Sequence, residues 1–157
     1  MTAHEKFMRM AIALSRQNVE QGAGGPFGAV IVKNGKVVAQ SANQVVAEND
    51  PTAHAEISAI RLACKQLGVY DLNGCTIYTS CEPCPMCLGA IYWAKLDAVY
   101  YANSKIDASS IGFDDNFIYE ELGKQFHQRR VKMVQLLRNE ALVAFKLWKD
   151  SESKTGY

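Results

Sequence analysis

Two short motifs constrain this chain most strongly, His54-Ala55-Glu56 and, later in the sequence, Cys84-Pro85-Met86-Cys87. One imidazole and two thiols are a ligand set that zinc accepts in a tetrahedral site, where the fourth position can be left for water. Glu56 is too close to His54 in the chain to be a comfortable second ligand, but it is well placed beside a metal. We therefore predict one Zn²⁺ per chain, held by His54, Cys84 and Cys87.

The residues that precede these ligands predict two helix N-termini. Asp50 followed by Pro51 is typical of an N-cap with proline in the first turn, which would place His54 and Glu56 near the positive end of a helix. Cys84 followed by Pro85 repeats the pattern, so both thiols are expected in the first turn of a second helix. The helix dipole and the unpaired N–H groups there favour thiolate over thiol.

Two other interpretations of the cysteines have to be weighed. Cys81 and Cys84 also form a C-x-x-C pair, so a closed structural zinc site with ligands Cys81, Cys84, Cys87 and His54 is an alternative. Such a site would leave no position for water and no role for Glu56. A thioredoxin-like redox pair is a second alternative, and it leaves the His54-Ala55-Glu56 motif unexplained.

Composition sets the class of protein. The chain has 157 residues, 48% of them hydrophobic, which predicts one globular domain spanning 1–157. A net charge of +1 gives no electrostatic reason to expect a nucleic-acid partner. Five cysteines are an odd number for a disulfide framework, and no apolar run approaches the roughly 20 residues of a membrane span. We expect a cytoplasmic protein without a membrane partner.

Hydrophobic patterning predicts alternating helices and strands. Thr2 and Glu5 form a capping box before a helix that ends near Gln21, and Asn34-Gly35 predicts a hairpin turn. The expected strands are 29–33, 36–42, 75–80, 98–102 and 131–137, and Asn139 is expected to cap a final helix that ends near Lys149. The glycines around Phe27 would let the backbone approach a flat ligand, although Phe27 is equally compatible with a core position. The tail 151–157 is polar and is expected to fray.

These motifs, in this order, resemble the cytidine deaminase-like superfamily over the whole chain. The resemblance implies an α/β class, a three-layer α/β/α fold around a mixed five-stranded sheet, and Glu56 as the general acid/base. Segments 25–29, 50–56 and 79–90 also resemble tRNA adenosine deaminases. Segments 91–94 and 112–119, with a C-terminal tyrosine, are instead similar to the small bacterial guanine deaminases. That similarity implies hydrolysis of guanine to xanthine and ammonia.

The same resemblance implies roles for further residues. Asn43 and Phe27 would contact the purine base, with Trp93 on the other side of the ring. Asp115 would lie near the amino group, where it would bind substrate and could assist Glu56 in protonating the departing amine. Tyr157 would complete the pocket, and the enzymes of this family are dimers that exchange C-terminal segments. We therefore expect a homodimer acting on a small purine.

Several other activities are compatible with these motifs. A tRNA adenosine deaminase would share the zinc chemistry but needs phosphate contacts, and the longest basic stretch here is Arg129-Arg130 with Lys132. Pterins, triazines and guanosine are alternative amino-substituted substrates. A non-catalytic zinc-stabilised module is the remaining alternative.

Overall fold

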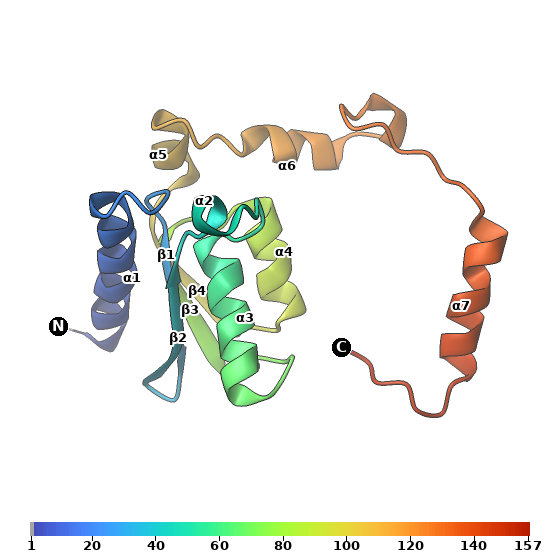
Figure 1. Cartoon of the computed structure of the whole chain (residues 1–157), viewed down its shortest axis with the longest axis horizontal. Coiled ribbons are helices and arrows are strands. Elements are labelled where there is room, and N and C mark those ends of the chain that lie inside the picture. Colours follow the sequence, from blue (N-terminus) through green and yellow to red (C-terminus); the bar gives the residue numbers. More distant parts are fainter. Residues whose placement is uncertain (1) are drawn as a thin grey trace. The chain divides into compact units, whose positions relative to one another are not determined.

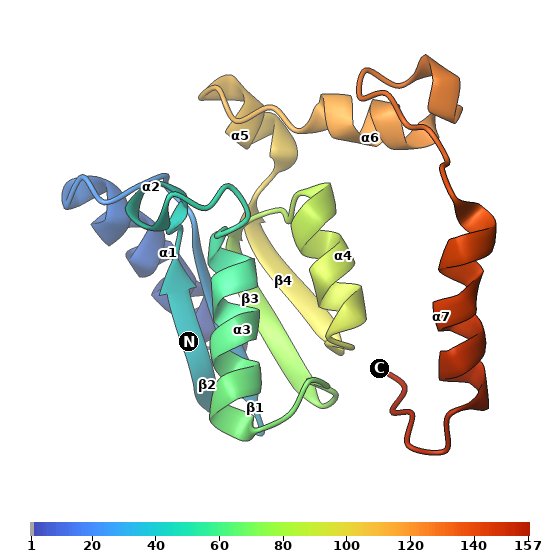
Figure 2. The same ribbon diagram turned by 45° about the vertical axis from the view of Figure 1, so that its right-hand side comes forward.

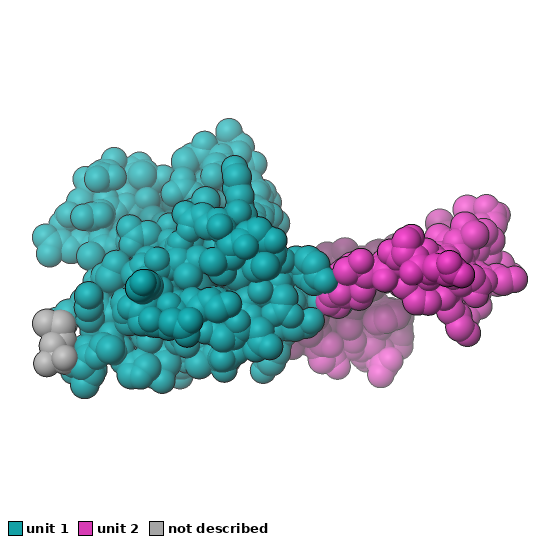
Figure 3. All heavy atoms as spheres, turned by 90° about the horizontal axis from the view of Figure 1, so that it is seen from below, with its two compact units in different colours: residues 1–116 teal, residues 117–157 magenta. Residues whose placement is uncertain are grey.

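The structure, a computed structural model, describes residues 2–157 and groups the chain into two compact units, Met1–Asn116 and Phe117–Tyr157. Figure 3 colours these two units separately. The first contains the whole β-sheet and both predicted zinc-ligand motifs. The single domain spanning 1–157 stays a prediction.

The first unit is built around a four-stranded mixed sheet. Its strands are β1 (Gly28–Lys33), β2 (Lys36–Ala42), β3 (Cys75–Cys81) and β4 (Ala98–Asn103), in the order β2-β1-β3-β4. The β1–β2 and β1–β3 pairs are antiparallel, and β3–β4 is parallel. Asn34 and Gly35 both have positive φ, which is the backbone that the predicted Asn-Gly hairpin turn requires.

Helices cover both faces of this sheet, as Figures 1 and 2 show. Helix α1 (Ala3–Glu20) lies on one face, and α3 (Ala55–Leu67) and α4 (Pro85–Trp93) lie on the other. The predicted Thr2–Glu5 capping box is present at the start of α1. The α/β class and the three-layer α/β/α fold are thus confirmed.

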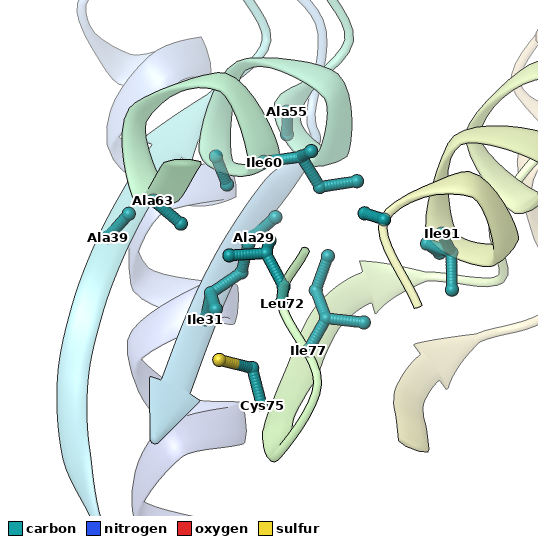
Figure 4. Packing of buried hydrophobic residues seen from close by; sticks show 12 residues of the cluster. Ala29, Ile31, Ala39, Ala55, Ile60, Ala63, Leu72, Cys75, Ile77 and Ile91 are labelled. Carbon is teal, nitrogen blue, oxygen red and sulfur yellow. The ribbon is translucent and has the colours of Figure 1, made fainter. Parts of the chain in front are cut away.

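Each sheet face has its own apolar core. On the α3–α4 side, Ile31, Leu72 and Ile77 are fully buried, and Figure 4 shows them packed beneath Ile60 and Ile91. On the α1 side, a smaller cluster contains the residues Phe7, Ala11, Val30, Val32 and Tyr78. Continuous burial of β1 explains why its sequence is an apolar run with little alternation.

The predicted fifth strand is wrong for the chain as described. Segment 131–137 contains no strand, and each of its five apolar residues is at least 49% exposed. The largely apolar sequence of this segment is compatible with a strand, but a strand forms only when a neighbour accepts its backbone hydrogen bonds. Among residues 2–157 no such neighbour is paired with this segment.

The remaining elements are short helices. They are α2 (Val45–Glu48), α5 (Lys105–Ser110), α6 (Asn116–Gly123), the 3₁₀ turn η1 (Phe126–Gln128) and α7 (Arg138–Asp150). The last of these begins one residue before Asn139, the predicted cap, and residues 151–157 contain neither helix nor strand. Within residues 2–157, no helix is both long and apolar enough to cross a membrane.

Candidate metal centre and active site

The two helices that face the same side of the sheet both begin at a predicted metal ligand. His54 is the N-cap of α3, and Cys84 is the N-cap of α4 with Pro85 at the first helical position. The predicted N-cap at Asp50 is wrong, because its carboxylate instead accepts hydrogen bonds from Thr52 N and Oγ1 at 2.8 and 2.7 Å. That local turn ends before the helix, which starts at Ala55.

His54, Cys84 and Cys87 form one cluster. The Nδ1 atom of His54 lies 3.6 Å from Cys84 Sγ and 3.5 Å from Cys87 Sγ. Zinc bound tetrahedrally at about 2.3 Å from sulfur and about 2.05 Å from nitrogen would separate those atoms by roughly 3.6 Å. The donor set and the spacing therefore fit a zinc ion.

The electrostatics of the cluster favour a thiolate. Hydrogen bonds from Cys87 and His54 lower the pKa of Cys84 to about 4, against the opposing effect of burial. The pKa of Cys87 is raised, first by its hydrogen bond to Cys84 and then by burial. The two thiols thus share one proton, with the charge on the sulfur at the start of α4, where the helix dipole stabilises it.

Cys81 does not join this cluster among residues 2–157. Its buried thiol lies 3.6 Å from the carbonyl oxygen of Ser104, and burial raises its pKa to about 11. The Cys81 thiol is thus hydrogen-bonded to a backbone carbonyl and lies outside the His54–Cys84–Cys87 cluster. This arrangement favours the open three-ligand site over the closed site that includes Cys81.

Glu56 lies in the first turn of α3 and is only 8% exposed. Burial raises the pKa of its carboxyl, and hydrogen bonds from its own backbone amide and from Cys87 oppose the shift. The carboxyl group therefore sits against the metal cluster in a site with little water. Such a carboxyl can exchange a proton with a molecule bound at the metal.

Antiparallel pairing brings the glycine-rich loop to the same end of the sheet. Gly28 N donates to Ser80 Oγ at 3.0 Å, which fixes the start of β1 beside the end of β3. Asn43 N donates to Phe27 O at 3.0 Å, so the two predicted base contacts are neighbours. Asn43 is buried, and its Oδ1 accepts from Val45 N at 3.3 Å.

Asp115 is partly buried beside this centre. Burial is the main cause of its raised pKa, and the negative charge of Cys84 is the second. The adjacent Asp114 has a different role, because its Oδ1 accepts a hydrogen bond from Asn116 N at 2.9 Å. Asp115 is thus electrostatically coupled to the cysteine cluster.

One predicted contact, Trp93, is not brought to this cluster within the first unit. Trp93 is the last residue of α4, nine residues after Cys84, so about 13 Å of helix separates the two. Its side chain is 69% exposed. Tyr157 belongs to the second unit and is 75% exposed.

The structure also shows residues that the sequence did not single out. Asn18 of α1 is buried, and its Nδ2 donates to Gly25 O at 2.8 Å and to Asn43 O at 3.1 Å. Phe113 packs against Phe27 with ring centroids 4.9 Å apart. An asparagine within a helix carries no sequence signal for such a role. Phe113, in contrast, lies inside segment 112–119, which resembles the small bacterial guanine deaminases.

Zinc-ligand spacing, a buried acid and a three-layer fold together define a zinc-dependent deaminase. The chain belongs to the family described as the cytidine and deoxycytidylate deaminase zinc-binding region, whose model matches residues 1–103.

Individual relatives narrow this class. The chain is 52% identical to the guanine deaminase of Bacillus subtilis (strain 168) over 154 residues, 98% of this chain and 99% of that protein. An X-ray structure of guanine deaminase from Bacillus subtilis matches with a TM-score of 0.96, covering 100% of this chain and 99% of that one.

Less similar relatives include both a tRNA-specific enzyme and a second guanine deaminase. A tRNA-specific adenosine deaminase of Agrobacterium fabrum is 43% identical over 64% of this chain and 66% of that protein. A structure of guanine deaminase from Nitrosomonas europaea is 35% identical with a TM-score of 0.66, covering 69% of this chain and 63% of that one. The likeness to the Bacillus enzyme covers the whole of this chain, including the second unit.

Proposed function

We propose that this protein hydrolyses guanine to xanthine and ammonia. The observation that supports this most strongly is the match to a guanine deaminase over nearly the whole of both chains, together with a preformed His54–Cys84–Cys87 cluster beside buried Glu56. Matches to tRNA-specific adenosine deaminases reach 43% identity over 64% of the chain and 37% identity over 77% of it. A nearly balanced charge, 17 basic against 16 acidic residues, also gives little attraction for RNA phosphates.

Each residue near the centre has a proposed part in the reaction. When bound, zinc supplies Lewis acidity that activates water. Glu56 accepts the proton released from that water and delivers it to the ring nitrogen next to the carbon under attack. Glu56 then takes the second proton from the hydroxyl group added to that carbon and passes it to the departing amine, as the C=O bond forms and the C–N bond breaks. Asp115 is the assisting acid or a hydrogen-bond partner of the amino group. One water is consumed and one ammonia is released.

Two residues are proposed to hold the base. Phe27 lies at the end of the glycine-rich loop, where its ring can stack on a flat heterocycle. The Asn43 amide keeps its Oδ1 on Val45 N, which leaves Nδ2 to donate to the polar edge of the base. Contact between Trp93 and the base stays a prediction, and its place at the far end of α4 does not favour it.

We also propose a homodimer in which C-terminal segments are exchanged. Helix α7 has 13 residues and buries none of them, although its sequence includes Phe145, Leu147 and Trp148. An isolated helix of that length is marginal in water, so its apolar side chains need a partner surface. The unpaired segment 131–137 needs a partner strand for the same reason.

A cytoplasmic location is proposed on the chemistry of the cysteines. All five are free thiols, and two of them belong to the metal cluster. Free thiols and thiolate metal ligands persist in reducing compartments.

Ammonia release from a panel of compounds tests the proposed substrate. The panel contains guanine, guanosine, cytidine, adenosine, a pterin, an amino-triazine and a tRNA. We expect turnover of guanine alone at high rate. Guanine left intact while cytidine or tRNA adenosine is deaminated would refute the proposal.

A further inference from the structure

Two aromatic rings from distant parts of the first unit are in contact with each other. Phe27 precedes β1, and Phe113 lies in the loop after α5. Their ring centroids are 4.9 Å apart and their planes are at 90°, an edge-to-face contact. Aromatic pairs favour this geometry because the positive edge of one ring meets the negative face of the other. The contact therefore fixes the plane of the Phe27 ring.

The glycine-rich loop leaves room for this pair and little more. A Cβ atom at Gly25 would lie 3.2 Å from Cδ2 of Phe27, 3.3 Å from its Cε2, and 3.5 Å from Cζ of Phe113. The loop backbone is itself held, because Asn18 Nδ2 donates to Gly25 O at 2.8 Å. Phe27 is thus confined by a fixed backbone on one side and by the Phe113 ring on another.

Phe113 is anchored through its own backbone. Its N–H donates to the carbonyl oxygen of Ala108 at 3.0 Å, which closes the end of α5. Gly112 has φ +93°, a value that side chains rarely permit, and it turns the chain toward Phe113. Asp115 follows two residues later and is partly buried near Cys84. The same loop therefore carries both Phe113, which contacts the Phe27 ring, and Asp115, which is proposed to bind the amino group of the substrate.

We propose that Phe113 is a positioning residue of the purine site, holding Phe27 in the plane on which a flat bicyclic base stacks and keeping that plane in register with Asp115. This inference rests on the proposed deamination of guanine. Phe113 acts through Phe27 and not on the reacting atoms. Its loss lets Phe27 sample other rotamers, which weakens base binding and leaves the proton transfers of Glu56 intact.

The test is a split between KM and kcat. In Phe113→Ala, we expect the KM for guanine to rise by about 3–10-fold, while kcat stays within about twofold of the wild type. The inhibition constant of hypoxanthine, a purine without the 2-amino group, should rise in parallel, since it reports binding alone. Phe113→Tyr keeps the ring edge and should restore both constants.

Ile111→Ala is the matched control, because Ile111 lies in the same loop, is 59% exposed, and is two residues from Phe113. It should leave KM unchanged. If Phe113→Ala does not fold, the comparison of Phe113→Leu with Phe113→Tyr carries the test.

Failure of the inference and failure of the proposed function are distinguishable. A wild-type enzyme without activity on guanine would refute the function whatever the variants do. An active wild type whose Phe113→Ala and Phe113→Leu variants bind guanine and hypoxanthine normally would overturn the positioning role. A large fall in kcat at unchanged KM would also overturn it.

Discussion

The Nδ1 atom of His54 lies 3.5 Å from the Sγ atom of Cys87, although 33 positions separate the two residues. That distance is close to the roughly 3.6 Å that tetrahedral zinc would impose on its nitrogen and sulfur ligands. The starts of α3 and α4 thus hold the ligands at metal-binding spacing through the fold itself. Binding then requires little rearrangement beyond loss of protons from the thiols.

The first prediction concerns metal content. We expect one zinc per chain, measured by elemental analysis of the purified protein, and Cys84→Ser should remove most of it. Cys81→Ser should keep both zinc and activity, because the Cys81 thiol donates to Ser104 O and stays outside the cluster. Loss of zinc from Cys81→Ser would instead support the closed four-ligand site.

The second prediction separates chemistry from folding at Glu56. Glu56→Gln keeps the size and polarity of the side chain but cannot carry the proton, so turnover should fall by roughly 10²–10⁴-fold. Zinc content and Tm should stay close to the wild type. The role assigned to Glu56 fails if the variant turns over guanine at a rate near that of the wild type.

The third prediction uses two glycines with opposite surroundings. A Cβ at Gly28 would come within 2.3 Å of Ala11 O and 2.8 Å of Leu14 Cβ, so Gly28→Ala should lower the free energy of unfolding by more than about 2 kcal/mol. A Cβ added at Gly89 of α4 would meet no atom within 4 Å apart from its chain neighbours and the backbone of its own helix. Gly89→Ala should therefore be neutral or stabilising by about 0.5–1 kcal/mol. Chemical denaturation measures the free energy of unfolding of both variants. Equal effects would contradict the close packing of α1 against Gly28 at the start of β1.

The metal centre was predictable because its information is local. Residue type and spacing alone predict metal binding by His54, Cys84 and Cys87, and Pro85 marks the start of α4. The helix start at His54 was missed by a few residues. Asp50 can cap a helix or close a turn, and its bonds to Thr52 show that the turn prevails here.

The remaining features depend on contacts across the sequence. No local pattern pairs Phe27 with Phe113, since their contact requires the sheet register that sets β1 beside β3. The strand predicted at 131–137 has a largely apolar sequence, but strand pairing is a property of two segments. The sequence of one segment does not identify the segment with which it would pair.

The last prediction concerns the C-terminal tail, where the sequence pattern and the family resemblance point in opposite directions. Residues 151–157 are polar up to Tyr157, whose ring is 75% exposed in the single chain. If the tail closes an active site, its deletion should raise KM for guanine, lower kcat, or both, while zinc content stays unchanged. A truncated protein as active as the full chain would show that the tail has no role in catalysis.

Mixing two defective chains decides whether the tail acts in its own chain or in a partner. Full-length Glu56→Gln has a tail but no proton carrier, and the chain without 151–157 has Glu56 but no tail. In a dimer with exchanged tails, the mixed species contains one centre with both parts. Unfolding and refolding an equal mixture should then recover roughly a quarter of the wild-type activity if chains pair at random. Each variant refolded alone gives the background, and a mixture no more active than the average of the two would place the tail over its own chain's centre.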